Sequence, residues 1–281
     1  MRSAPYTVII PARNEAAVIA HLLRSIGADR AVAHRQVLVL CNGCSDGTAA
    51  LARAAAPMAT VLETAEGGKW RAINAGLAAA RHGPVIVLDA DVAISGDALD
   101  ALAAALSQAG VWAVSPAVTF DLAGCDRWVR GYYRVFRHHP YLQSGIGGAG
   151  VYGLSEAGRA ALGPLPPVAS DDGLIRSRIP PERQRRIAQD AVGRPVVSRV
   201  CPPPRLAQLV LTEARWRRGD RQLLALGQAV PRCPGFLLGL LWRRAIRPGD
   251  ALCYVVVKLA GWLLARWPGR GGEAGWLPDR A

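Results

Sequence analysis

The sequence predicts an α/β fold: a mostly parallel sheet with helices on both faces, followed by a C-terminal helical appendage. Short strand-like segments alternate with helical segments over residues 6–110. The strands are continuously apolar, which is typical of parallel strands covered on both faces. After residue 235 the alternation gives way to two apolar segments of helical spacing. One layered domain with a helical extension explains all three observations.

Four strands are expected in the first part of the chain. Each is a run of apolar, often β-branched residues that ends at a polar or glycine-containing loop. They are YTVII (6–10), VLVL (37–40), TVLE (60–63) and PVIVLDAD (84–91).

A helix is expected after each strand, from the spacing of its apolar residues. Asn14 is expected to cap the first helix, because Asn accepts hydrogen bonds from unpaired N–H groups at helix starts. The second helix begins at about Thr48, the third covers 69–80, and the fourth carries Leu99, Leu102 and Leu106. The apolar face of the first helix is Val18, Ile19, Leu22, Leu23 and Ile26.

The loops that follow the four strands are the predicted ligand site. In an open α/β sheet, ligands bind beyond the carboxyl ends of the strands. This rule brings four segments around one crevice: Pro11–Glu15, Cys41–Asp46, Glu66–Lys69 and Asp89–Asp91.

The charge of the chain favours anionic partners. Its formal net charge is +13, almost all of it from arginine, since Lys69 and Lys258 are its only lysines. Phosphates, nucleic acid and an acidic membrane face are the candidate partners. The N-terminal apolar run is too short for a signal peptide, so we expect a cytoplasmic protein with reduced thiols.

Two aspartates at the end of the fourth strand indicate a divalent cation. Asp89 and Asp91 project from the crevice at close range, where like charges repel unless a cation or several donors neutralise them. One or two carboxylates together with substrate phosphates are the usual ligands of Mg²⁺ or Mn²⁺. The alternative is an ordinary cap or turn.

Three further motifs lie in the predicted loops. EGGKW places Lys69 at a helix start, where its charge suits a pyrophosphate. GIGGAG (145–150) matches a dinucleotide fingerprint in letters but follows no buried strand, so a loop that admits substrate to the backbone is preferred. SDDGLIR (170–176) is interpreted as a loop whose paired acids can supply a general base, with a plain turn as the alternative.

The segment DALCYVVVKLAGWLLARW is expected to form an amphipathic helix. It does not contain the roughly 18 uncharged residues that are needed to span a bilayer, which favours a helix lying in a membrane interface. A helix packed against the domain is the alternative. Its predicted apolar face is Leu252, Val255, Val256, Leu259, Trp262 and Leu263.

Taken in order, the motifs resemble the family 2 glycosyltransferases, which have the Rossmann-like GT-A fold. The resemblance covers roughly residues 5–222. It implies a nucleotide-sugar-binding half (1–112), an acceptor and catalytic half (113–222) and a C-terminal segment (223–281). The segments that carry it are VIIPARNEAAVIAHLLRSI, VLVLCNGCSDGTAALA, GGKWRAINAGL, VIVLDAD, GGAGVYGLS, ASDDGLIR and RWRRGD.

The resemblance implies transfer of a sugar from a nucleotide-sugar donor to an acceptor hydroxyl, with inversion at the anomeric carbon. Asp91 would bind Mg²⁺ or Mn²⁺ on the diphosphate, with Asp89 on the ribose or the metal. Asp172 would be the general base, with Asp171 beside it. The remaining implied donor-binding residues are Pro11, Arg13, Glu15, Asn42, Asp46, Lys69 and Arg215.

The resemblance is incomplete at three positions. Asn42 stands where many members carry an acid thought to read the base, which leaves the nucleotide open. Asp171 replaces the commoner Glu. Thr212 occupies the Gln position of the Q-x-x-R-W signature of processive members, so we expect addition of a single sugar. The basic segment 215–218 is a candidate lid over the diphosphate, or else a solvated face.

The expected partners follow from the same resemblance. The acceptor is unidentified, a lipid-linked molecule or a polysaccharide precursor, and the enzyme would sit peripherally on the inner face of the plasma membrane. A sugar-phosphate nucleotidyltransferase is an alternative, but IIPARNE lacks the glycine run that it needs. A basic nucleic-acid binder is another, although no aromatic-interleaved platform supports it.

Overall fold

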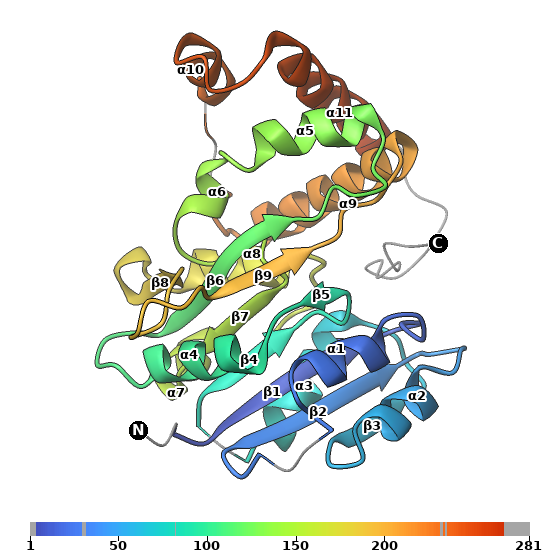
Figure 1. Cartoon of the computed structure of the whole chain (residues 1–281), viewed down its shortest axis with the longest axis vertical. Helices are drawn as coiled ribbons and strands as arrows, with labels where there is room; N and C mark the ends of the chain where they lie inside the picture. The colour runs from blue at the N-terminus through green and yellow to red at the C-terminus, as the bar shows by residue number, and fades with distance from the viewer. Residues whose placement is uncertain (1–3, 30–31, 82, 231–232, 234, 267–281) are drawn as a thin grey trace.

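The computed structural model describes residues 4–29, 32–81, 83–230, 233 and 235–266. A curved sheet with helices on both faces forms the body of the molecule, and a helical layer forms one end (Figure 1). The predicted α/β class with a C-terminal helical region is therefore confirmed.

The first four strands are parallel and lie in the order β3-β2-β1-β4. All four were predicted, with bounds that differ by a few residues. They are β1 (Tyr6–Ala12), β2 (Arg35–Asn42), β3 (Thr60–Thr64) and β4 (Val85–Leu88). Because they are parallel, their carboxyl ends meet at one edge of the sheet.

The second half of the sheet is mixed. Strand β7 runs antiparallel to both β4 and β6, and so joins the parallel half to the rest of the sheet. The sheet continues through β6 to β8 and, by way of β9, to β5. The strands are β5 (Val92–Ala93), β6 (Ala113–Phe120), β7 (Val151–Leu154), β8 (Gln184–Ile187) and β9 (Val197–Val200).

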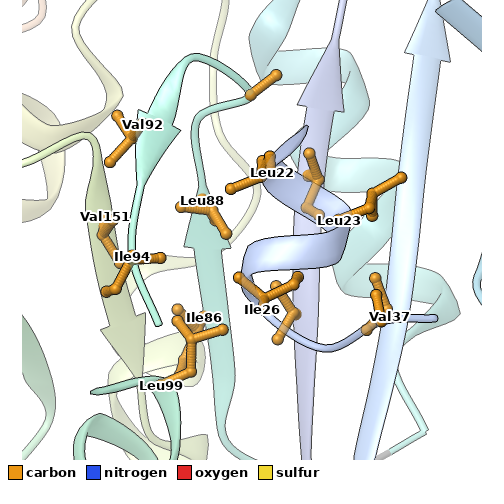
Figure 2. Close-up of a cluster of buried hydrophobic side chains, with 14 of the residues drawn as sticks. Leu22, Leu23, Ile26, Val37, Ile86, Leu88, Val92, Ile94, Leu99 and Val151 are labelled. Carbon is orange, nitrogen blue, oxygen red and sulfur yellow. The ribbon is translucent and has the colours of Figure 1, made fainter. Parts of the chain in front are cut away.

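Helices cover the two faces of the sheet with separate cores. One core lies under α1 (Ile19–Ser25), α2 (Thr48–Ala55) and α4 (Gly96–Leu106). Figure 2 shows Leu22 and Leu23 of α1 beside strand residues such as Leu88. Each buried side chain of this kind contributes about 1.5–3 kcal/mol. The other core lies under α3 (Lys69–Ala79), α7 (Glu156–Leu162) and α8 (Asp171–Arg178).

The predicted cap of the first helix is wrong. Helix α1 begins at Ile19, and Val18 occupies the capping position without a side-chain hydrogen bond. Asn14 lies in the preceding turn with a φ of 57°. Its Oδ1 accepts a hydrogen bond of 2.8 Å from the backbone N–H of Ser45. Asn tolerates this left-handed conformation, and here its side chain ties two crevice loops together.

The helical layer forms a third core around aromatic side chains. Tyr132 of α5 stacks on Tyr254 of α11 with ring centroids 5.1 Å apart, and Phe136 stacks on Trp216 of α9 at 5.8 Å. The elements are α5 (Arg127–Phe136), α6 (Pro140–Gln143), α9 (Leu206–Ala225), α10 (Phe236–Trp242) and α11 (Pro248–Arg266), with a short 3₁₀ turn at Pro181–Arg183.

The domain boundary expected after residue 222 falls inside α9, so it is not a structural boundary. Helix α11 packs on both α9 and α5. Lys258 of α11 binds Glu213 of α9 with N–O distances of 2.9 and 3.0 Å. Arg221 of α9 donates to the Ala265 carbonyl at 2.8 Å, near the end of α11. The described part of the C-terminal segment thus belongs to the helical layer, whereas residues 267–281 lie outside the described residues.

The close approach of α11 to α9 depends on Gly261. A Cβ at this position would lie 2.4 Å from Glu213 Cγ. We expect Gly261→Ala to lower the free energy of unfolding by about 1–3 kcal/mol, because the two helices must separate. Gly239→Ala on α10 is the matched control, since its Cβ would meet nothing within 4 Å. The control should be neutral or gain about 0.5–1 kcal/mol from helix propensity. Urea melts that give the two variants equal stability would contradict the packing.

Candidate active site

A cavity of about 220 Å³ opens at the carboxyl ends of β1 and β4. Helices α8 and α9 and the glycine-rich loop 145–150 complete its walls. The crevice therefore lies where the strand order predicted it. Eight of the predicted site residues line it: Pro11, Glu15, Lys69, Asp89, Asp91, Asp171, Asp172 and Arg215.

Lys69 forms two ion pairs in the cavity. It is the first residue of α3, and its Nζ lies 2.7 Å from Asp89 Oδ1 and 3.1 Å from Asp171 Oδ1. Burial alone would lower the pKa of Lys69, but the carboxylates of Asp171 and Asp89 raise it above its ordinary value. The lysine therefore stays charged and joins the end of β4 to the start of α8.

Asp171 has both carboxylate oxygens engaged. Its Oδ1 faces Lys69, and its Oδ2 accepts a hydrogen bond of 3.0 Å from the hydroxyl of Tyr152. Its side chain is only 6% exposed. These contacts make Asp171 a positioning residue rather than a group free to accept a proton. The expected loop at 170–176 is also wrong, because both aspartates lie in the first turn of α8, where acids interact favourably with the helix dipole.

Asp172 points into the cavity within a set of four donors. Its Oδ2 accepts from the Tyr141 hydroxyl at 2.9 Å and from the Gly148 backbone N–H at 3.2 Å. Its Oδ1 accepts from the Gly173 N–H at 2.8 Å and from Ser170 Oγ at 3.2 Å. The carboxylate is half-buried, so a ligand in the cavity can reach an oriented acceptor.

The glycine-rich loop is held from behind by arginines. Arg176 donates to the carbonyls of Ser144 at 2.6 Å and Ile146 at 2.8 Å, and Arg186 donates to that of Gly147 at 2.8 Å. Gly147 has a φ of 138°, and a Cβ there would lie 2.2 Å from the Tyr141 ring. The loop leads into strand β7 and not into a helix, so the dinucleotide fingerprint lacks its structural context.

Three predicted donor-binding residues do not line the cavity. The guanidinium of Arg13 lies against Gly67, 3.0 Å from where a Cβ would sit. Asn42 Nδ2 donates to the Gly68 carbonyl at 2.6 Å, and its buried Oδ1 has no hydrogen-bond partner among the described residues. Both therefore adjoin the turn that precedes Lys69.

Asp46, the third of these residues, is used to build the loop. It accepts hydrogen bonds from the Thr48 N–H at 3.0 Å and the Ala16 N–H at 3.2 Å. Burial would raise the pKa of Asp46, but these bonds and the Thr48 hydroxyl outweigh it and hold the pKa below its usual value. The side chain thereby orders the start of α2.

The C-x-x-C pair is structural. Cys41 lies near the end of β2. Burial raises the pKa of its thiol to about 12, and the neighbouring Cys44 adds to this shift. The thiolate is the reactive form in redox and metal chemistry, and this environment disfavours it. Cys44 Sγ lies 3.5 Å from the Ala12 carbonyl. Cys41 is buried and Cys44 is half-buried, so both thiols fill space beside the end of the strand.

The proposed lid at 215–218 is wrong. These residues form the middle of the 20-residue helix α9, whose neighbours in the helical layer fix its position. Arg217 Nε binds Glu213 Oε1 at 3.0 Å, and Arg218 donates to the Leu264 carbonyl at 3.4 Å. Only Arg215, together with Trp216, reaches the cavity.

The side chains that orient the acids were not predicted from the sequence. Tyr141 and Tyr152 flank the glycine-rich loop and donate to Asp172 and Asp171. A buried tyrosine hydroxyl usually has a hydrogen-bond partner, so the tyrosines beside YLQSGIGGAGVYG were a usable signal. Trp216 lies in the R-W part of the quoted signature, whereas Ser170 carried no such signal, because only the packing of α8 and α9 brings it to the site.

The cavity suits a divalent cation completed by substrate. Five carboxylates line it against two cationic side chains. Burial and the neighbouring Asp171 and Asp91 raise the pKa of Asp89, although Lys69 opposes the shift. Among the described residues no group of three or more His, Cys, Asp or Glu could hold a metal. Asp89 and Asp91 both line the cavity, and two carboxylates completed by phosphate and water are an arrangement that Mg²⁺ and Mn²⁺ favour.

Comparison with known proteins decides the family. The profile of glycosyl transferase family 2 matches residues 7–156, more than half of the chain. The chain belongs to this family. It is therefore a glycosyltransferase, and the sequence resemblance is confirmed. No curated protein matches the chain.

A solved structure confirms the GT-A fold of this glycosyltransferase. A mannosyltransferase from Pyrobaculum calidifontis, in complex with GDP-Man and Mn²⁺, matches with a TM-score of 0.61 at 23% identity. The match covers 99% of this chain and 78% of that one. Glucosyl-3-phosphoglycerate synthase from Mycobacterium tuberculosis, in complex with UDP, matches with a TM-score of 0.47 at 20% identity, over 66% of this chain and 69% of its own. The first similarity shows a shared fold, and the second adds no argument.

The ion pairs of Lys69 should be visible in stability measurements. We expect Lys69→Met to lower the free energy of unfolding by about 2–4 kcal/mol, because it leaves Asp171 buried without a counter-charge. The double variant Lys69→Met/Asp171→Asn should recover part of this loss. Arg53→Gln is the control, since it breaks the exposed Arg53–Glu63 pair and should change stability by less than about 0.5 kcal/mol. Equal effects of Lys69→Met and the control in chemical denaturation would refute the role of Lys69.

Proposed function

We propose that this glycosyltransferase moves a single sugar from a nucleoside diphosphate sugar to an acceptor hydroxyl, with inversion at the anomeric carbon. The observation that carries the proposal is the placing of Asp172 in the same cavity as Asp89 and Asp91. The acceptor hydroxyl needs a base that takes its proton, and the leaving diphosphate needs positive charge that stabilises it. The cavity offers residues for both.

Asp172 is the proposed general base. Inversion requires one in-line attack by the acceptor oxygen, which loses its proton as the bond to the sugar forms. The proton passes to a carboxylate oxygen of Asp172. The hydrogen bonds from Tyr141 and Gly148 fix the direction of that carboxylate before substrate binds. No covalent intermediate is needed, so the second carboxylate, Asp171, can remain paired with Lys69.

The diphosphate leaves at the opposite side of the sugar. Its departing charge must be stabilised by preorganised cations, and Lys69 and Arg215 both line the cavity. Asp89 and Asp91 would hold Mg²⁺ or Mn²⁺, which supplies further positive charge to the diphosphate when bound. The adjoining residues Arg13 and Asn42 are the proposed contacts to the nucleoside.

The acceptor is proposed to be lipid-linked or otherwise membrane-proximal, and the enzyme to act at the cytoplasmic side. Support comes from the net charge of +13 and from α11, the one described helix that is long and apolar enough to cross a membrane. Transfer of one sugar per binding event is the proposed outcome, because Thr212 replaces the glutamine of the processive signature.

A thermal-shift screen with two variants tests the donor and the metal together. We expect one nucleoside diphosphate to raise Tm only when Mn²⁺ or Mg²⁺ is present, because the protein supplies too few ligands for the cation by itself. Asp91→Ala should abolish this metal-dependent shift. Asp172→Asn should keep the shift and lose about 10²–10⁴-fold in kcat with the matching nucleotide sugar.

Asp97→Asn is the control for both variants, because Asp97 is exposed on α4 and does not line the cavity. Unchanged turnover in both Asp91→Ala and Asp172→Asn would refute the assignment. Pyrophosphate release from a sugar phosphate and a nucleoside triphosphate would instead indicate a nucleotidyltransferase.

Tyr141 should affect turnover without affecting donor binding. Tyr141→Phe removes one of the four hydrogen bonds to Asp172 and leaves the ring that packs on the glycine-rich loop. We expect kcat to fall about tenfold, while the nucleotide-induced shift in Tm stays the same. Tyr254→Phe, which removes a hydroxyl in the helical layer, is the control and should leave kcat unchanged. A fall in Tm shift equal to the fall in kcat would contradict this positioning role.

A further inference from the structure

The outward face of α11 is an apolar ridge exposed to solvent. Its large side chains recur at helical spacing, and Leu252, Leu259 and Leu263 are each more than half exposed. Small and aromatic residues on the opposite face, such as Ala251 and Gly261, pack against α5 and α9. The full ridge is Leu252, Val255, Leu259, Trp262 and Leu263. A contiguous exposed apolar stripe of five large side chains indicates a surface that binds an apolar partner.

A second apolar group lies on α10. Leu238 is 72% exposed and Trp242 is 86% exposed. Figure 1 shows α10 and α11 at the same end of the molecule, away from strands β1–β3. Tryptophan is enriched where proteins meet the boundary between lipid and water, because its ring is apolar and its N–H is polar. Trp242 and Trp262 both occupy exposed positions of this kind.

The residues around this apolar surface carry positive charge. Arg243, Arg244 and Arg247 lie exposed between α10 and α11, and Arg266 ends α11. The only acid in residues 235–266 is Asp250, which is buried and binds Arg134 at 3.1 Å. The surface is therefore apolar with a cationic border, which complements an anionic lipid surface. A second copy of the same face would bring like charges together.

The packing of α11 favours a helix that lies along a membrane rather than across it. The helix has 19 residues and is long and apolar enough, by length and composition, to span a bilayer. However, Lys258 lies on its packed side and binds Glu213, whose side chain is only 2% exposed. Spanning would break this pair and expose Glu213. An amphipathic helix in the interface keeps every one of these contacts.

We propose that the ridge of α11, the exposed tip of α10 and the arginines between them form a docking surface for an anionic phospholipid bilayer. The apolar side chains insert to the depth of the headgroups, and the arginines contact lipid phosphates. Helix α9 connects this surface to the active site, because its Glu213 holds α11 and its Arg215 lines the cavity. The proposal adds a lipid partner to the proposed transfer and does not depend on which sugar is transferred.

Vesicle binding tests the surface directly. The full-length protein is sedimented, without any nucleotide sugar, with phosphatidylcholine vesicles that contain about one third phosphatidylglycerol or none. We expect binding to the anionic vesicles, weakened by salt, and at least tenfold weaker binding to the neutral ones. Absence of binding to anionic vesicles, or equal binding to both kinds, would overturn the proposal.

Two variants locate the binding surface. Leu259→Gln/Leu263→Gln and Arg243→Gln/Arg244→Gln/Arg247→Gln should each weaken binding to anionic vesicles at least tenfold. Met58→Gln/Val192→Gln removes two exposed apolar side chains elsewhere. Arg24→Gln/Arg81→Gln/Arg185→Gln removes the same charge from exposed positions that are far in sequence from the test arginines. Both controls should bind like the parent protein, and a control that loses as much as its test variant would overturn the proposal.

Two further measurements separate this proposal from its alternatives. The nucleotide-induced shift in Tm should be the same in every variant, because none of the altered residues lines the cavity. If a ridge variant loses this shift in Tm, that variant is misfolded. Vesicle binding by the arginine variant, which changes only exposed side chains, then tests the proposed surface. Analytical ultracentrifugation should show a monomer. A dimer that the Leu259/Leu263 variant abolishes would overturn the proposal, because a second copy would then cover the ridge.

Discussion

The site depends on one half-buried ammonium group among aspartates. Lys69 stands at the start of α3 and binds Asp89 after β4 and Asp171 in α8, so three elements from both halves of the sheet meet at its charge. Without it, carboxylates held this close would repel one another or take up protons. With it, the cavity still has an excess of negative charge that a further cation can neutralise. The same lysine therefore links three elements of the fold and leaves a net negative charge in the cavity, where the proposed metal would bind.

The second feature of the site is that its acids have separate tasks. Asp171 is closed off by Lys69 and Tyr152, whereas Asp172, one residue later, faces the cavity. The helix start sets this difference, because consecutive residues of a helix point about 100° apart. The donors on Asp172 come from the glycine-rich loop and its flanking Tyr141, and arginines hold that loop by its carbonyls. The protein itself thus orients the proposed base, which lowers the cost of arranging it during reaction.

Helix α9 joins the chemistry to the helical layer. Arg215 and Trp216 reach the cavity, while Glu213 and Arg221 fasten α11 to the opposite side of the helix. Trp216 also stacks on Phe136 of α5, so the wall of the site is part of an aromatic core. The basic segment 215–218, expected to be a lid or a solvated face, lies inside α9, where Arg217 binds the Glu213 carboxylate and Arg218 donates to the Leu264 carbonyl.

The sequence by itself determined the strand and helix pattern of the parallel half, the crevice at the strand ends and the residues Lys69, Asp89, Asp91 and Asp172, because these follow from local periodicity and motif order. It could not determine that Asn14 ties loops instead of capping a helix, that 215–218 lies within a helix, or that two tyrosines orient the acids. Those facts depend on contacts between residues far apart in the chain, such as Tyr141 with Asp172 and Lys258 with Glu213. The predicted apolar face of α11 was the informative case. The periodicity identified the stripe, but only the tertiary structure showed that the opposite face is the packed one, because Gly261 and Lys258 fit α9 and the leucines do not.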